Sequence, residues 1–93
     1  MIRLTLLEHD VLKYIAKLKE YKYIARDEDG KIYVYEKKPR KSYCQWCIIG
    51  HPYFFEQVSL PGYRKPYEFV QWEDEEPMLI EDILSNCEVV DNA

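Results

Sequence analysis

Three cysteines and a histidine are the residues of this 93-residue chain best suited to metal or redox chemistry. Cys44 and Cys47 form a Cys-x-x-Cys pair, His51 follows four residues later, and Cys87 is distant in the sequence. A structural zinc ion takes four such ligands, so these four are the one plausible zinc set. The pair lies in an aromatic, β-prone run, where residues three apart point to opposite faces of a strand. We therefore expect no cofactor and free cysteines that pack as small hydrophobic residues in a reducing compartment.

Other catalytic patterns are not found in the sequence. His9 lies beside Asp10 and His51 beside a proline, but neither accompanies a nucleophile in a recognisable motif. The chain has only three glycines, and they do not form a phosphate-binding loop. A redox role for Cys44 and Cys47 would need the amino terminus of a helix. We expect no catalytic residues and no enzyme.

The charged residues divide the chain into two parts. All 13 Lys and Arg lie between Arg3 and Lys65, together with eight acids, so that stretch carries 13 − 8 = +5. Residues 66–93 contain nine acids and no base, which gives −9 and restores the net charge of −4. A basic body followed by an acidic carboxyl-terminal third is the most informative global feature of the sequence.

The acidic third predicts a partner-binding surface. Carboxylates beside a tryptophan can occupy a basic groove and imitate the charge of a nucleic-acid backbone. The candidate residues are Trp72, Glu73, Asp74, Glu75, Glu76, Glu81 and Asp82. Two simpler interpretations stay open: an acidic solubilising end, or acids that fold back onto the basic loop of the same chain.

That basic loop supports an alternative function. Basic side chains beside aromatic rings are typical of proteins that bind single-stranded nucleic acid, because phosphates pair with the charges and bases stack on the rings. The candidate residues are Lys37, Lys38, Arg40, Lys41 and Tyr35. A solvated turn, with the tyrosines in the core, would explain the same residues, and the net negative charge opposes nonspecific binding.

Periodicity predicts the elements that position these residues. Thr5 and Glu8 match a capping box at the start of a helix over residues 5–20, with an apolar stripe at positions 4, 7, 11, 15 and 18. Residues 21–26 and 31–36 predict a hairpin joined by a turn that ends in Gly30. In its second strand, Ile32 and Val34 face one side, while Tyr33 and Tyr35 face the other.

The rest of the chain predicts further strands and one short helix. Strands are expected at 43–49, 53–60 and 67–72. A short helix is expected to begin at Pro77 and to continue over 78–84, while residues from Asn86 should fray. The sequence therefore predicts a single α+β domain over residues 1–93. Its amino-terminal helix packs on about five antiparallel strands, as a curled open sheet or an SH3- or Sm-like barrel. No apolar run reaches the length of a membrane span, and no signal peptide is visible.

Three phrases of the sequence carry a resemblance. "YIARDEDG" at 23–30, "YVYEKKP" at 33–39 and "VQWEDEEP" at 70–77 resemble small accessory proteins of phages and prophages of Gram-positive bacteria. Cys44 and Cys47 are not part of that pattern. The resemblance implies a phage genome and a bacterial cytoplasm. Small acidic phage proteins often bind and disable a host protein, including CRISPR nucleases, so the partner implied is a host protein with a basic groove.

Overall fold

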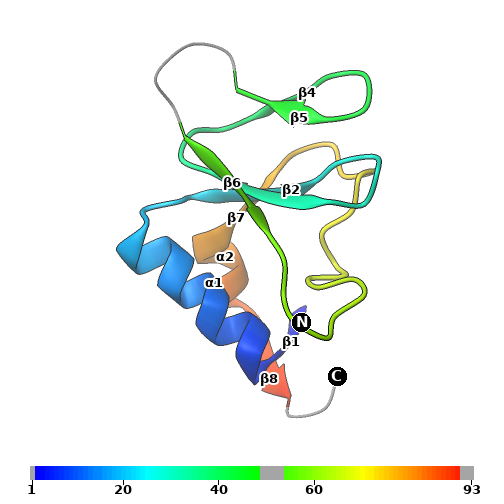
Figure 1. Ribbon diagram of the computed structural model, residues 1–93. Coiled ribbons are helices and arrows are strands. Elements are labelled where there is room, and N and C mark those ends of the chain that lie inside the picture. The colour runs from blue at the N-terminus through cyan, green and yellow to red at the C-terminus, as the bar shows by residue number, and fades with distance from the viewer. Residues whose placement is uncertain (1, 49–53, 91–93) are drawn as a thin grey trace.

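The computed structural model of the chain describes residues 2–48 and 54–90, shown in Figure 1. In chain order the elements are β1 (Ile2–Thr5), α1 (Leu6–Leu18), β2 (Tyr23–Arg26), β3 (Ile32–Tyr35), β4 (Arg40–Lys41), β5 (Trp46–Cys47), β6 (Phe55–Val58), β7 (Met78–Leu79), α2 (Ile80–Ser85) and β8 (Cys87–Val90). Neither helix of the described part is long and apolar enough to cross a bilayer.

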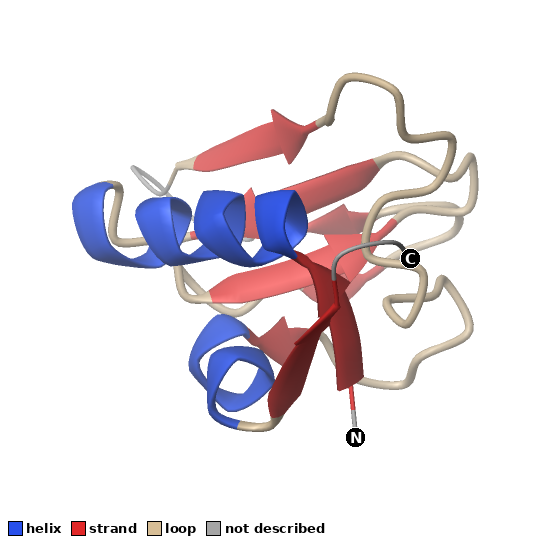
Figure 2. Cartoon of the chain, turned by 90° about the horizontal axis from the view of Figure 1, so that it is seen from below, coloured by secondary structure: helices blue, strands red, loops and turns tan. Residues whose placement is uncertain are grey.

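The central layer is an antiparallel sheet with strand order β6-β3-β2-β7. Both helices lie on one side of this sheet, and the β4–β5 hairpin lies on the other (Figures 1 and 2). A separate parallel pair, β1 and β8, joins the two ends of the described chain. The predicted α+β class, with a helix on a small antiparallel sheet, is confirmed. The described strands form an open sheet with β6 and β7 at its edges, so the barrel alternative is not found.

The predicted capping box begins α1. The Glu8 amide donates to Thr5 Oγ1 at 3.2 Å, and the Thr5 amide donates to Glu8 Oε1 at 2.9 Å. The buried face of the helix consists of Glu8, Leu12 and Ile15. The predicted stripe was therefore wrong in part, because Leu7 and Leu18 are 44% and 75% exposed. The stripe was counted from residue 4, which belongs to β1 rather than to the helix.

The β2–β3 hairpin and its turn are confirmed. Gly30 adopts the left-handed conformation, with φ of +93°, and its amide donates to the Asp27 carbonyl at 3.0 Å. The alternation of β3 separates two hydrophobic cores. Ile32 and Val34 face the helices in the main core, whereas Tyr35 joins the second core beneath the β4–β5 hairpin, with Tyr33 packed against it.

Two predicted strands differ from the structure. Residues 67–72 form turns instead of a strand, because Tyr67 has a φ of +55° and cannot continue an extended backbone. Within the described residues 43–48, only Trp46–Cys47 is a strand, and it pairs with Arg40–Lys41, which was expected to be a connection. The strand predicted at 53–60 is present as β6 over Phe55–Val58, while residues 49 and 53 of these two predictions lie outside the described residues. Pro39 precedes β4 and so does not interrupt its ladder.

The carboxyl-terminal region also differs. Met78 and Leu79 form β7 against β2, so α2 begins at Ile80 and Pro77 is not its first residue. Residues 87–90 do not fray but form β8, which runs parallel to β1 with Ile2 opposite Cys87. These strands were missed because a two-residue strand and a four-residue edge strand have too little periodicity to detect. Their partners lie more than 50 residues away in the sequence.

Candidate functional site

The acidic residues that follow Trp72 lie on a turn held by its own hydrogen bonds. We call residues 73–76 the acidic turn. The Gln71 amide donates to Asp74 Oδ2 at 3.1 Å, and the Asp74 amide donates to the Gln71 carbonyl at 3.1 Å. Asp74 is therefore half-buried and bonded within the turn, whereas Glu73, Glu75 and Glu76 are exposed. Three of the four carboxylates are free to face a partner or solvent.

Trp72 fixes the acidic turn onto the second core. Its ring meets the Trp46 ring edge-on, with 6.4 Å between centroids. The Lys41 ammonium lies 4.3 Å from the Trp72 ring centroid and donates a hydrogen bond to the Trp72 carbonyl. The ring therefore packs on its own chain, and its predicted use as an anchor in a partner would require it to leave this contact.

The acidic turn also contacts the basic loop. Lys38 Nζ lies 3.0 Å from Glu76 Oε2, in a pair whose side chains are 57% and 70% exposed. Together with Lys41 on Trp72, this pair agrees with the interpretation that the acids fold back onto the chain. The contact uses one of the three exposed carboxylates, so Glu73 and Glu75 stay available.

Glu81 and Asp82 form a second acidic group. Both are exposed in the first turn of α2, where carboxylates favour the positive end of the helix dipole. Glu81 lines a groove between the two helices that also contains Lys17 and Lys22. β7 separates this group from the acidic turn, so the structure divides the predicted surface into two parts.

The alternative nucleic-acid site is not assembled as predicted. The Tyr35 side chain is only 2% exposed and belongs to the second core, so its ring offers no face for a base. Lys38 forms an ion pair with Glu76, and Lys41 donates a hydrogen bond to the Trp72 carbonyl. Lys37, which precedes β4, and Arg40, at the start of β4, are both exposed.

The described cysteines of the predicted zinc set lie apart. Cys44 is exposed and Cys47 half-buried in the β4–β5 hairpin, while Cys87 packs against the main core in β8. Figure 1 shows β5 and β8 at opposite ends of the molecule. His51 lies outside the described residues. Within residues 2–48 and 54–90, no group of three potential metal ligands comes together.

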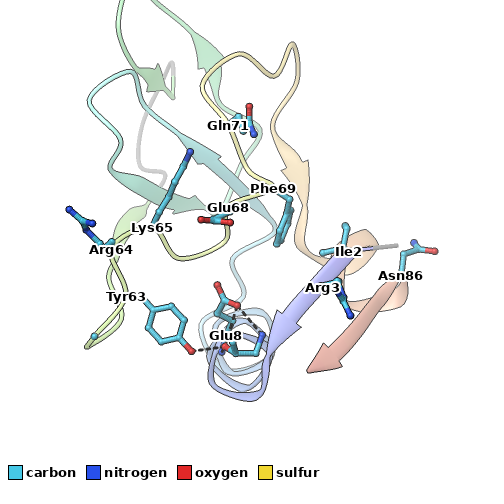
Figure 3. Close-up of a pocket in the computed structure, with 12 residues that line it drawn as sticks. Ile2, Arg3, Glu8, Tyr63, Arg64, Lys65, Glu68, Phe69, Gln71 and Asn86 are labelled. Carbon is cyan, nitrogen blue, oxygen red and sulfur yellow. Dashed lines mark hydrogen bonds between the residues drawn. The ribbon is translucent and has the colours of Figure 1, made fainter. Parts of the chain in front are cut away.

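A cleft with a volume of about 1090 Å³ lies between β1 and the loop that contains Tyr63 and Glu68 (Figure 3). Glu8 is at its floor, 6% exposed, and was predicted only as a helix cap. Its Oε2 accepts the Tyr67 amide at 2.7 Å while Oε1 accepts the Thr5 amide. Because its two oxygens accept amides from two different segments, this carboxylate connects the start of α1 to the loop that contains Tyr67.

Arg26 is a second buried charged residue whose hydrogen bonds hold the backbone of a loop. It is 4% exposed, and its guanidinium donates to the carbonyls of Val70, Gly30, Pro66 and Tyr67. Loss of hydration lowers the pKa of this guanidinium from its usual value, while the charge of Glu68 opposes the shift. An inward-facing arginine in a strand was the one sequence signal for this role.

The geometry thus defines a small open-sheet α+β protein with two acidic groups, in which no group of three potential metal ligands comes together among the described residues. Comparisons with protein families, curated proteins and solved structures find no match to the chain.

Proposed function

We propose that this chain is a non-enzymatic protein that binds a basic surface of another protein through the acidic turn, with Glu81 and Asp82 extending the contact. The observation that supports it is the fixed presentation of exposed carboxylates on a turn anchored by Trp72. A surface that is ordered before binding loses less conformational entropy when the partner arrives. Exposed charges of one sign also steer the encounter and raise the association rate.

The Lys38–Glu76 pair is compatible with this function. Exposed ion pairs contribute little to stability, about 0–1 kcal/mol. A partner that supplies several cations can therefore displace Lys38 from Glu76 without unfolding the turn. In the absence of a partner, the same pair connects the acidic turn to the segment that precedes β4.

The partner we propose is a host protein with a basic nucleic-acid-binding groove, such as a defence nuclease. Two arguments support this choice. A row of carboxylates imitates the spaced charge of a phosphate backbone, and the sequence phrases resemble accessory proteins of phages. The chain would then act by occupying the groove that its target uses for DNA or RNA.

The test compares two variants with the same net charge, −4 + 3 = −1. The first carries Glu73→Gln, Glu75→Gln and Glu76→Gln, which leaves Asp74 in place to hold the turn. The matched control carries Asp10→Asn, Glu20→Gln and Glu28→Gln, three exposed acids outside the proposed surface. Affinity capture from a Gram-positive bacterial lysate, followed by mass spectrometry, compares both with the unmodified chain.

A supporting result has three parts: the control captures the same basic protein as the unmodified chain, the acidic-turn variant loses it, and an oligonucleotide competes for it. Equal capture by both variants would overturn the proposal. A low-salt gel shift on single-stranded DNA and RNA examines the alternative function. Binding that disappears in Arg40→Gln would replace the proposed function with nucleic-acid binding.

A further inference from the structure

A small pocket with aromatic walls lies between the β4–β5 hairpin and the second face of the sheet. Its volume is about 180 Å³, below the roughly 300–1,000 Å³ of pockets that hold drug-sized molecules. This size suits one head group or side-chain end. We call it the aromatic pocket, and its principal lining residues are Asp27, Tyr33, Tyr35, Gln45, Trp46 and Phe55.

The rings come together because of strand register. Tyr35 of β3 lies directly opposite Phe55 of β6, with ring centroids 6.0 Å apart. Tyr33 shares their face of the sheet, and its ring centroid is 6.1 Å from that of Phe55. Trp46 reaches the same space from the hairpin, where its indole nitrogen donates to the Arg26 carbonyl at 3.1 Å. Four rings from three strands therefore surround one small volume.

Asp27 adds a carboxylate to this aromatic lining. It is only 7% exposed, and its Oδ1 accepts the Trp46 amide at 2.9 Å. An ionised carboxylate has about four acceptor sites, so this bond leaves capacity for a ligand. Loss of hydration is also the main reason that the pKa of Asp27 is raised. A cation in the pocket would oppose that loss by pairing with the carboxylate.

Aromatic rings around a carboxylate are suited to one class of ligand. The faces of aromatic rings attract cations, and cages of this kind recognise quaternary and methylated ammonium groups. Besides Asp27, the polar side chains among the described lining residues are Gln45, the two tyrosines and the Cys47 thiol, so an unmodified ammonium with three donors would find few side-chain acceptors. A quaternary or multiply methylated ammonium has few or no N–H donors to satisfy, so it fits this lining better.

The neighbouring surface already holds a cation over aromatic rings. Lys41 Nζ lies 5.2 Å from the Trp46 ring centroid and 4.3 Å from that of Trp72. Lys41 is retained there by its hydrogen bond to the Trp72 carbonyl and does not line the aromatic pocket. Trp46 therefore contributes to two adjacent environments, and among the described residues a Lys or Arg side chain lies in only one of them.

We propose that the aromatic pocket binds a quaternary or multiply methylated ammonium group, with Asp27 as its counter-ion and the rings of Tyr33, Trp46 and Phe55 as its walls. This site is separate from the acidic turn and does not depend on the function proposed above. It gives the chain a means of recognising a methylated lysine side chain or a choline-type head group.

The test uses choline and its neutral isostere, 3,3-dimethylbutan-1-ol, as probes of the full chain. Titration at millimolar concentrations is followed by the NMR resonance of the Trp46 indole N–H. We expect saturable shifts with choline and binding weaker by on the order of tenfold for the neutral isostere, because it lacks the charge. Equal affinity for both probes, or no saturable shift with choline, would overturn the site. Tighter binding of methylammonium, which keeps three N–H donors like an unmodified lysine, or of guanidinium would overturn the assignment to an ammonium group that lacks such donors.

Matched variants distinguish the pocket from general electrostatics. Asp27→Asn keeps an oxygen that can accept the Trp46 amide but removes the charge, and should weaken choline binding by on the order of tenfold. Asp29→Asn makes the same charge change on the exposed side of the same turn and should leave binding unchanged. If both weaken binding equally, the effect is long-range charge alone and the pocket is wrong. Phe55→Leu, at a side chain already 59% exposed, tests a wall without relying on the stability of the Asp27 variant, and unchanged choline affinity there would also contradict the pocket.

Discussion

Arg26 donates hydrogen bonds to a loop that lies 40–44 residues further along the sequence. Its guanidinium also donates to a carbonyl oxygen of the β2–β3 turn, in addition to those of the loop after Lys65. A guanidinium can make several such bonds at once because its donors are fixed in one plane, whereas a lysine has one compact ammonium. Because the positive charge is buried, its contribution to the free energy of unfolding depends on these hydrogen bonds to carbonyl oxygens.

Arg26→Lys should therefore lower the free energy of unfolding by about 2–4 kcal/mol, because several buried carbonyls lose their donor. Urea denaturation followed by tryptophan fluorescence measures this loss. Arg40→Lys, at an exposed position, serves as the control and should change stability by no more than about 0.5 kcal/mol. Equal denaturation midpoints for the two variants would show that the Arg26 bonds contribute little.

Asp27 gives a pH dependence of the opposite sign to that of most aspartates. Its pKa in the folded chain is raised above 3.8, mainly by burial, so the folded state holds the proton more strongly than the unfolded state. The stabilisation from that proton is complete below pH 3.8 and is lost as pH rises through the folded-state pKa.

We expect Asp27→Asn to become more stable relative to the unmodified chain as pH rises from about 3 to about 7, because asparagine has no proton to lose. Thermal unfolding at several pH values measures the difference. Asp29→Asn, at the exposed end of the same turn, should show little of this trend. A difference that stays constant with pH would mean that Asp27 is not destabilised by burial.

At the scale of elements, the sequence predicted what depends on local contacts. The capping box of Thr5 and Glu8 and the turn at Gly30 are local, and both are present. β1, β7 and β8 depend on distant partners and were missed. The turn at Tyr67 could not be predicted either, because a left-handed tyrosine is stabilised by bonds to Glu8, 59 residues away in the sequence.

The same limit applied to the candidate site. The sequence showed where the acids lie, but not that Trp72 packs on Trp46 beneath Lys41. It grouped Tyr35 with the basic loop, although strand alternation already placed Tyr35 on the face of the sheet opposite Ile32 and Val34. The aromatic pocket was not predicted, because its lining comes from three strands whose register is set by the folded sheet.

The β1–β8 pair makes a specific prediction for hydrogen exchange. In a two-stranded parallel ladder, alternate amides of β8 donate to β1. We expect those alternate amides within residues 87–90 to exchange more slowly than the amides of Glu73, Glu75 and Glu76, which lie in the acidic turn. Exchange measured by NMR distinguishes the two cases. Unprotected rates throughout 87–90 would restore the expectation of a frayed end.

At the scale of the whole molecule, two cores share one sheet. The main core joins the sheet to the helices, and the second core joins it to the β4–β5 hairpin and Trp72. Lys41 links the hairpin to Trp72, the residue directly before the acidic turn, across this second core. The presentation of the acidic turn is therefore a property of the assembled molecule rather than of its own sequence.

Lys41→Met should loosen this link while keeping an apolar stem of similar length. We expect a loss of about 1–2 kcal/mol in the free energy of unfolding and a red shift of tryptophan emission, because the cation over both rings and its hydrogen bond disappear. Lys31→Met, at an exposed position in β-strand surroundings, is the control. An unchanged emission spectrum in Lys41→Met would indicate that Trp72 is held by other contacts.

The parallel pairing of Ile2 with Cys87 has a consequence for the order of events during synthesis. β1 is synthesised before its partner strand, which emerges only after nearly all of the described chain has been made. The ladder between them can therefore form only after β8 has emerged, whereas the β2–β3 hairpin can form much earlier. Contacts of such long sequence separation slow folding, so the nascent chain keeps β1 unpaired until β8 is available.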